Sequence, residues 1–401
     1  MQEQVTSVEG AECVAVGLQL GMKRKHGLVV PRVRALAKGM ACGEDGGVMD
    51  RRTFLAGTGA TLATGVVAKR FSFARKLGVS SASFAIRNRF SRAAQTPPGV
   101  AVFDGPVGFL EHCHRLQTVG VQISVRGWSE RGLGKKLRAK AEALGMYLEG
   151  QISLPRTEAD VERFDAEVAA AKEIGVTILR TVMLGGRRYE NFNSAADWAA
   201  FGKSSWQRLT WAEPVAKKHG VKLALENHKD WRIDEMLAIL KRISSKHVGV
   251  NLDTGNNLAL LEDPHAVVEA LAPHTITTHL KDMAVQEYEQ GFLLSEVPLG
   301  EGFLDLKRIV ATCEKANPHV RHNLEMITRN PLKVPCLTQR YWKTFGQRPV
   351  QDLIAALDRV RSNKPTVPLP SLAGKSPAEQ VAYEQANNAR SIAYAHAHLK
   401  I

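Results

Sequence analysis

The sequence is poor in cysteine and has no glycine motif for binding a dinucleotide. Its five cysteines lack the paired spacing of a zinc site, and they are too few for a disulfide framework in a chain of 401 residues. No Gly-x-Gly-x-x-Gly sequence follows an apolar run that predicts a strand, so a dinucleotide site is not supported. The length allows one large domain or two ordinary ones.

A formal net charge of +14 is the second compositional feature. Such an excess is found in proteins that bind nucleic acid or an anionic surface. However, the Lys and Arg residues are scattered along helix-like segments and are not gathered in one block. This pattern is typical of solvated helix faces, so we expect no nucleic-acid partner.

An export signal is predicted ahead of the folded domain. Residues 49–68 open with Met49 and the twin arginine Arg51-Arg52, and a mildly apolar run rich in small residues follows. This segment resembles a twin-arginine signal peptide, and its run is too short and too rich in Gly and Thr for a stable membrane span. A basic leader without an export function is the alternative.

The resemblance to an export signal implies a periplasmic protein that keeps no stable membrane span after the signal is removed. Because such signals stand at the extreme N-terminus, we expect residues 1–48 to be disordered or to precede a true start at Met49.

Short β-type runs alternate with helical stretches from Leu77 onward. Eight strands, each followed by a helix, fit a (β/α)8 TIM barrel of the α/β class better than an open doubly wound sheet. We expect the barrel over residues 77–345, with a long loop at 283–300. The predicted strands are 77–84, 119–125, 147–154, 176–183, 221–226, 247–253, 274–280 and 320–326.

A C-terminal helical extension is expected over residues 346–401. One helix is predicted at about 349–361, and a proline-rich link follows it. Ser376 then stands where an N-cap is expected and Pro377 occupies the first helical position, so a final helix should begin here.

Four consecutive predicted strands end in a polar side chain: Glu226, Asp253, His279 and Glu325. In a (β/α)8 barrel the carboxyl ends of the strands meet at one mouth, so these four side chains can converge. Three carboxylates and one imidazole form a mostly hard ligand set, which suits one divalent metal. Mn²⁺ is the first choice, and Mg²⁺, Co²⁺ and Zn²⁺ are alternatives. Taken singly, each residue could equally be a hydrogen-bonding or capping residue.

These strand ends also carry a resemblance to a known family. The chain resembles the xylose isomerase-like TIM barrel superfamily of sugar phosphate isomerases and epimerases (AP endonuclease family 2), which includes endonuclease IV. The resemblance implies that the four residues bind one metal ion and that Glu226 and Glu325 also form an acid/base pair. It depends on the segments 224–228, 252–256 and 278–282, on Gly300-Glu301-Gly302 with Asp305, and on Leu324-Glu325.

Residues close to these ends are candidates for binding substrate. His228 and Lys281 each follow a predicted ligand by two positions and should project near the mouth, with a surface role as the alternative. Asn256 stands where epimerases of the family often have a histidine. The predicted strands at 119–125 and 147–154 contain no histidine, so a three-zinc nuclease of the endonuclease IV type is not expected.

The function that these features predict is a metal-dependent sugar isomerase or epimerase, which removes a proton next to the carbonyl of a sugar or keto-sugar. A lyase or hydratase acting on 3-keto-glycosides with the same site is one alternative. An exported carbohydrate-binding barrel without turnover is the other. The expected partner is a small carbohydrate, and the sequence leaves the oligomeric state open.

Overall fold

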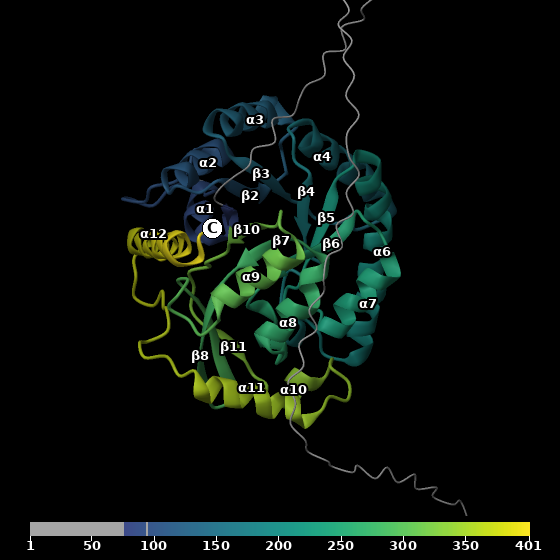
Figure 1. The fold of residues 1–401 in the computed structure, drawn as a ribbon, viewed down its shortest axis with the longest axis vertical. Coiled ribbons are helices and arrows are strands. Elements are labelled where there is room, and N and C mark those ends of the chain that lie inside the picture. Colours follow the sequence, from purple (N-terminus) through teal and green to yellow (C-terminus); the bar gives the residue numbers. More distant parts are fainter. Residues whose placement is uncertain (1–75, 94) are drawn as a thin grey trace, which may run out of the picture. The chain divides into compact units, whose positions relative to one another are not determined.

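Eight parallel strands form a closed barrel in the computed structural model, which describes residues 76–93 and 95–401 (Figure 1). Strand β1 pairs with β10, with Leu77 opposite His322, and this pairing closes the barrel. The predicted fold is therefore confirmed. The strands are β1 (Leu77–Ser80), β2 (Gly120–Ser124), β3 (Tyr147–Gln151), β4 (Ile178–Thr181), β5 (Lys222–Glu226), β6 (Val248–Asp253), β7 (Thr275–Leu280) and β10 (Arg321–Leu324).

The strands read as apolar runs because helices cover their outer face and side chains fill the barrel. All six residues of β6 are buried, for example. The covering helices include α2 (Gly105–Arg115), α3 (Leu133–Leu144), α4 (Val161–Glu173), α6 (Ala195–His219), α7 (Ile233–Ile243), α8 (Pro264–Leu271) and α9 (Leu306–Ala316). No helix among the described residues is both long and apolar enough to cross a membrane.

The predicted signal at 49–68 and the segment 1–48 lie outside the described residues. Export and periplasmic location therefore stay predictions.

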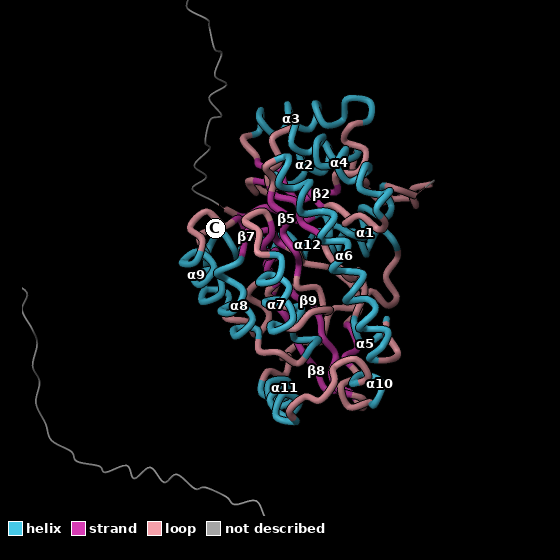
Figure 2. Tube along the Cα trace, turned by 90° about the vertical axis from the view of Figure 1, so that its right-hand side faces the viewer, coloured by secondary structure: helices cyan, strands magenta, loops and turns pink. Residues whose placement is uncertain are grey.

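A second, antiparallel sheet replaces the loop that we expected at 283–300. It consists of β8 (Asp282–Tyr288), β9 (Gly291–Val297) and β11 (Leu332–Val334). The loop prediction was wrong because Gln286 and Glu287 interrupt the apolar pattern, although both belong to a regular hairpin strand. Strand β8 begins two residues after β7 ends, so the sheet continues from the carboxyl end of the barrel. Figure 2 shows β8 and β9 between the barrel and helices α10 (Gln339–Trp342) and α11 (Val350–Ser362).

The final helix, α12 (Pro377–Tyr394), begins at the expected N-cap, where the Ser376 hydroxyl accepts a hydrogen bond from the Glu379 amide. The helix packs against the segment that follows β1, beside α1 (Ala85–Ser91) in Figure 1. The buried Glu384 carboxylate accepts hydrogen bonds from the amides of Ile86 (2.7 Å) and Arg87 (3.0 Å).

A further hydrogen bond runs from the Asn388 amide to the carbonyl of Ser83, at 2.6 Å. The C-terminal helix is thus part of the wall at the carboxyl end of β1.

Candidate metal centre and active site

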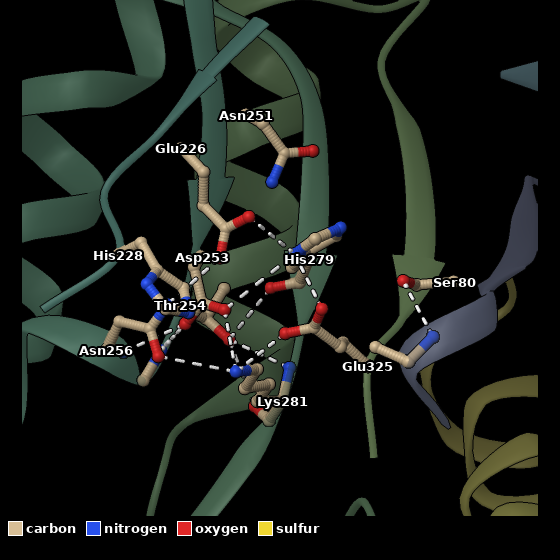
Figure 3. Close-up of polar contacts among 12 residues, drawn as sticks. Ser80, Glu226, His228, Asn251, Asp253, Thr254, Asn256, His279, Lys281 and Glu325 are labelled. Carbon is tan, nitrogen blue, oxygen red and sulfur yellow. Dashed lines mark hydrogen bonds and ion pairs between the residues drawn. The ribbon is translucent and has the colours of Figure 1, made fainter. Parts of the chain in front are cut away.

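The four predicted ligands meet at the carboxyl ends of neighbouring strands (Figure 3). Glu226 and Asp253 are the last residues of β5 and β6, His279 is the penultimate residue of β7, and Glu325 follows β10. The parallel register places Asp253 directly opposite His279. Because β5, β6, β7 and β10 are consecutive in the barrel, side chains from distant parts of the sequence share one site.

All four side chains are buried, and one possible ligand atom from each lies within 4.8 Å of the others. The Nδ1 atom of His279 lies 3.2 Å from Glu325 Oε1, 3.3 Å from Glu226 Oε2 and 3.9 Å from Asp253 Oδ2. Three carboxylates therefore surround a single ring nitrogen.

The opposite edge of the His279 ring determines which nitrogen faces the carboxylates. Its Nε2 atom lies 2.8 Å from the side-chain oxygen of Gln122, on β2. The Gln122 amide nitrogen donates to Glu149 (3.2 Å) and Asn251 (3.4 Å), so its oxygen must face the imidazole. Nε2 is then the donor to Gln122, and Nδ1 is the nitrogen that faces the carboxylates.

These residues fit a divalent metal ion. His279 Nδ1 is buried without a hydrogen-bond partner of good geometry among the described residues. Burial lowers the pKa of His279, but Glu325 and Glu226 outweigh this effect and raise the pKa to about 9. Without a metal, a proton occupies Nδ1 at neutral pH, and a divalent cation would take the same position. Carboxylate oxygens and an imidazole nitrogen are suitable ligands for such an ion.

Two cations, the partly buried Arg180 and the buried Lys281, hold the carboxylates in their ionised form. Arg180, on β4, forms an ion pair with Glu226, and burial raises the pKa of Glu226 less than Arg180 and His279 lower it. Lys281 Nζ lies 2.9 Å from Asp253 Oδ2 and 2.7 Å from Glu325 Oε2. The pKa of Glu325 is likewise held well below its usual range, since His279 and Lys281 outweigh its burial.

The predicted substrate-binding residues lie beside this cluster. His228 and Asn256 lie on the same side of it in Figure 3. The His228 Nδ1 atom contacts the Leu184 carbonyl at 3.0 Å, and burial lowers the pKa of His228 to about 3, so its imidazole is neutral. Asn256 donates to Glu226 Oε1 at 3.1 Å and accepts from Lys281 at 3.3 Å, so it orients charged groups of the site.

Sequence reasoning missed several residues of the site. Gln122 and Arg180 lie inside apolar strands, where a polar or charged residue is itself a signal. Glu296 belongs to the unexpected sheet, and its carboxylate forms ion pairs with Arg329 and, at 3.7 Å, with Lys281. Lys229 was overlooked because nothing in its local sequence predicts burial.

A cavity of about 600 Å³ opens at the carboxyl ends of β1, β2 and β3. Ser81, Arg126, Phe103 and Gln151 are among the residues that line it. The Gln151 amide donates to the Gln122 oxygen at 3.2 Å, the same oxygen that contacts His279. The volume is within the usual range for small-molecule sites. Hydrogen bonds through Gln151 and Gln122 connect the cavity lining with the predicted ligand His279.

The sequence matches the family described as "Xylose isomerase-like TIM barrel" over residues 120–344. This segment is more than half of the chain and contains all four predicted ligands. The protein therefore belongs to this family.

Individual relatives are more distant. The 3-oxo-isoapionate decarboxylase of Pectobacterium atrosepticum is 28% identical over 225 residues, which cover 49% of this chain and 77% of that protein.

Solved structures resemble the chain in fold. A D-psicose 3-epimerase, crystallised in the presence of D-fructose, gives a TM-score of 0.51 at 13% identity and covers 82% of this chain and 100% of its own. A xylose isomerase-like TIM barrel protein from Mycobacterium smegmatis, in complex with magnesium, gives a TM-score of 0.47 at 19% identity and covers 70% of this chain and 97% of its own.

Proposed function

We propose that the protein is a divalent-metal-dependent isomerase or epimerase that acts on the carbon next to the carbonyl group of a sugar or keto-sugar. The observation that carries this proposal is the convergence of Glu226 and Glu325. Each places an oxygen within 3.3 Å of His279 Nδ1. Because two strands separate β5 from β10 in the barrel, the two carboxylates approach this point from different directions.

The arrangement suits proton transfer at carbon. A divalent cation would supply the positive charge that stabilises negative charge on the substrate oxygens. One carboxylate of the Glu226 and Glu325 pair can then remove the carbon-bound proton, and the other can return it. Arg180 and Lys281 keep both carboxylates ionised at neutral pH, so each can accept a proton.

Family membership supports an enzyme with a small carbohydrate substrate. The fold shared with the D-psicose 3-epimerase is compatible with the same chemistry. The choice of Mn²⁺ over Mg²⁺, Co²⁺ or Zn²⁺ remains part of the proposal.

A lyase is the second candidate, and two observations favour it. The 28% identical relative is a decarboxylase, and cationic side chains gather around the cluster. In a decarboxylation, the bond between the carboxylate carbon and its neighbour breaks, the electron pair moves toward the adjacent carbonyl, CO₂ leaves, and a proton is added at carbon. Elimination from a 3-keto-glycoside would use the same stabilised charge. Both the decarboxylation and the elimination would use the same four predicted metal ligands.

The two candidates can be separated with one panel of substrates. The Mn²⁺-loaded protein is incubated in D₂O with ketoses, 3-keto-glycosides and 3-oxo sugar acids, and the mixtures are followed by NMR. Deuterium incorporation with recovery of an isomer supports the isomerase or epimerase. Release of CO₂ or of an aglycone supports the lyase. If no compound exchanges, isomerises or breaks down while carbohydrate still binds, the barrel binds carbohydrate without turnover.

A further inference from the structure

Lys229 is a buried ammonium group that forms no ion pair with a carboxylate of the described residues. Its side chain is 3% exposed, and its backbone has a positive φ of 59°. Its polar contact is with the side-chain oxygen of Asn256, the atom that also accepts from Lys281. No carboxylate oxygen of the described residues lies within 4.0 Å of its Nζ atom.

The other cations of the site each have a carboxylate partner. Arg180 is paired with Glu226, Lys281 with Asp253 and Glu325, and Arg329 with Glu296. A buried charge is unfavourable unless an opposite charge compensates it. Burial, followed by Lys281 and Arg329, lowers the pKa of Lys229 to about 8, which still leaves most of this lysine protonated at neutral pH.

A count of the charged groups around the cluster indicates the charge that a substrate should carry. Apart from the His279 imidazole, which would be neutral on a bound metal, the four cations Arg180, Lys229, Lys281 and Arg329 balance the four carboxylates Glu226, Asp253, Glu296 and Glu325, so 4 − 4 = 0. A divalent metal ion would raise this balance to +2. A neutral sugar would leave that excess uncompensated beside the buried Lys229 and Lys281, whereas an anionic substrate would reduce it.

We infer that Lys229 binds a carboxylate of the substrate, and that the substrate class is therefore an acidic sugar, such as a keto-aldonic acid. This inference rests on the proposed function, because it assumes that the substrate lies at the metal cluster. The carboxylate is close to the reacting carbons, since Asn256 contacts both Lys229 and the predicted ligand Glu226. A single free cation matches one carboxylate better than a dianionic phosphate.

The test compares ligands of one carbon skeleton. D-Erythronate, erythritol and erythritol 4-phosphate are titrated calorimetrically into the full-length protein, both metal-free and loaded with Mn²⁺. We expect wild type to bind erythronate about 10-fold to 100-fold more tightly than erythritol, which is the usual contribution of a buried charge-assisted hydrogen bond. Tighter binding of the phosphate than of erythronate would overturn the assignment to a carboxylate.

Lys229→Met should remove the preference for erythronate without changing the affinity for erythritol or the Mn²⁺ stoichiometry. Lys400→Met is the matched control, because Lys400 is an exposed lysine that also has a positive φ (63°). A preference that persists in Lys229→Met would show that the metal alone attracts the anion, and the inference would fail. If Lys229→Met does not fold, wild type alone decides the question. Equal binding of erythronate and erythritol to wild type would also overturn the inference.

Failure of the proposed function gives a different result. In that case no substrate exchanges deuterium in the NMR assay, while the erythronate preference and its dependence on Lys229 remain measurable in the calorimeter.

Discussion

His279 Nε2 lies 2.8 Å from the side-chain oxygen of Gln122, a residue three strands away around the barrel. This contact turns the other ring nitrogen toward three carboxylates. Gln122 is itself held by Glu149 and Asn251 inside the barrel. The interior of the barrel therefore orients a side chain at its mouth.

Replacing Gln122 should weaken metal binding without removing a ligand. Gln122→Ala is expected to lower the Mn²⁺ affinity about 10-fold to 100-fold, because the imidazole loses the partner that fixes its tautomer and orientation. Calorimetric titration of Mn²⁺ measures the change, and Gln286→Ala on the exposed side of β8 is the control. Equal affinities in both variants would mean that His279 is oriented by its packing alone.

Removing the imidazole should abolish the metal site. Elemental analysis of the dialysed wild type is expected to find one divalent ion per chain, and His279→Ala should retain little or none, since a buried ligand is lost from the set of four. His319→Ala, which changes an exposed histidine, serves as the control. An unchanged metal content in His279→Ala would rule out the four-residue site.

Glu226 and Glu325 should matter for proton transfer as well as for metal binding. Glu226→Gln and Glu325→Gln keep an oxygen ligand, but each should lower the rate of deuterium exchange about 100-fold to 10,000-fold, because an amide cannot accept the carbon-bound proton. NMR in D₂O measures the rate after metal content has been checked. The exposed Glu158→Gln is the control. Wild-type exchange in both metal-loaded variants would leave the pair as ligands only.

Glu384, on α12, should make the folded protein more stable at low pH. Burial raises the pKa of Glu384 from 4.5 to about 7, although the amides of Ile86 and Arg87 lower it. The folded protein thus favours the protonated carboxyl group, and its contribution to stability is present below pH 4.5 and lost as the pH rises through 7. We expect the free energy of unfolding of wild type to fall by about 3 kcal/mol relative to that of Glu384→Gln as the pH rises from 4.5 to 7.

Urea unfolding at a series of pH values measures this difference. Glu130→Gln, at an exposed position, should follow wild type throughout. A gap between wild type and Glu384→Gln that does not vary with pH would contradict the prediction.

The predicted twin-arginine signal at residues 49–68 should direct export. A reporter fused behind residues 49–80 should cross the inner membrane, and replacing both Arg51 and Arg52 with Lys should block its passage, because the pathway recognises the twin arginine. Fractionation of cells locates the reporter. Transport that is unaffected by the double substitution would identify the segment as a leader of another type.

The barrel was predictable because each strand is a short apolar run with a helix after it, and the strands found lie within the predicted ranges. The four clustered residues were predictable because they directly follow such runs. The hairpin of β8 and β9 was not predictable, because Gln286, Glu287 and Glu289 interrupt the apolar pattern that would indicate a strand. The partners of the cluster depend on contacts between distant strands, as in the pairs Arg180 with Glu226 and Gln122 with His279. The local sequence around a residue does not indicate which distant residue it will contact.

The bond between Asn388 and Ser83 joins residues 305 positions apart. A ribosome makes the β1 segment early and the α12 segment near the end of the described chain. The wall beside β1 can therefore be completed only when synthesis is almost finished, and until then α1 and the segment after β1 lack the helix that packs against them. Folding that depends on such late contacts is slow and leaves apolar surface open to other chains, so we expect this protein to need a chaperone during its production.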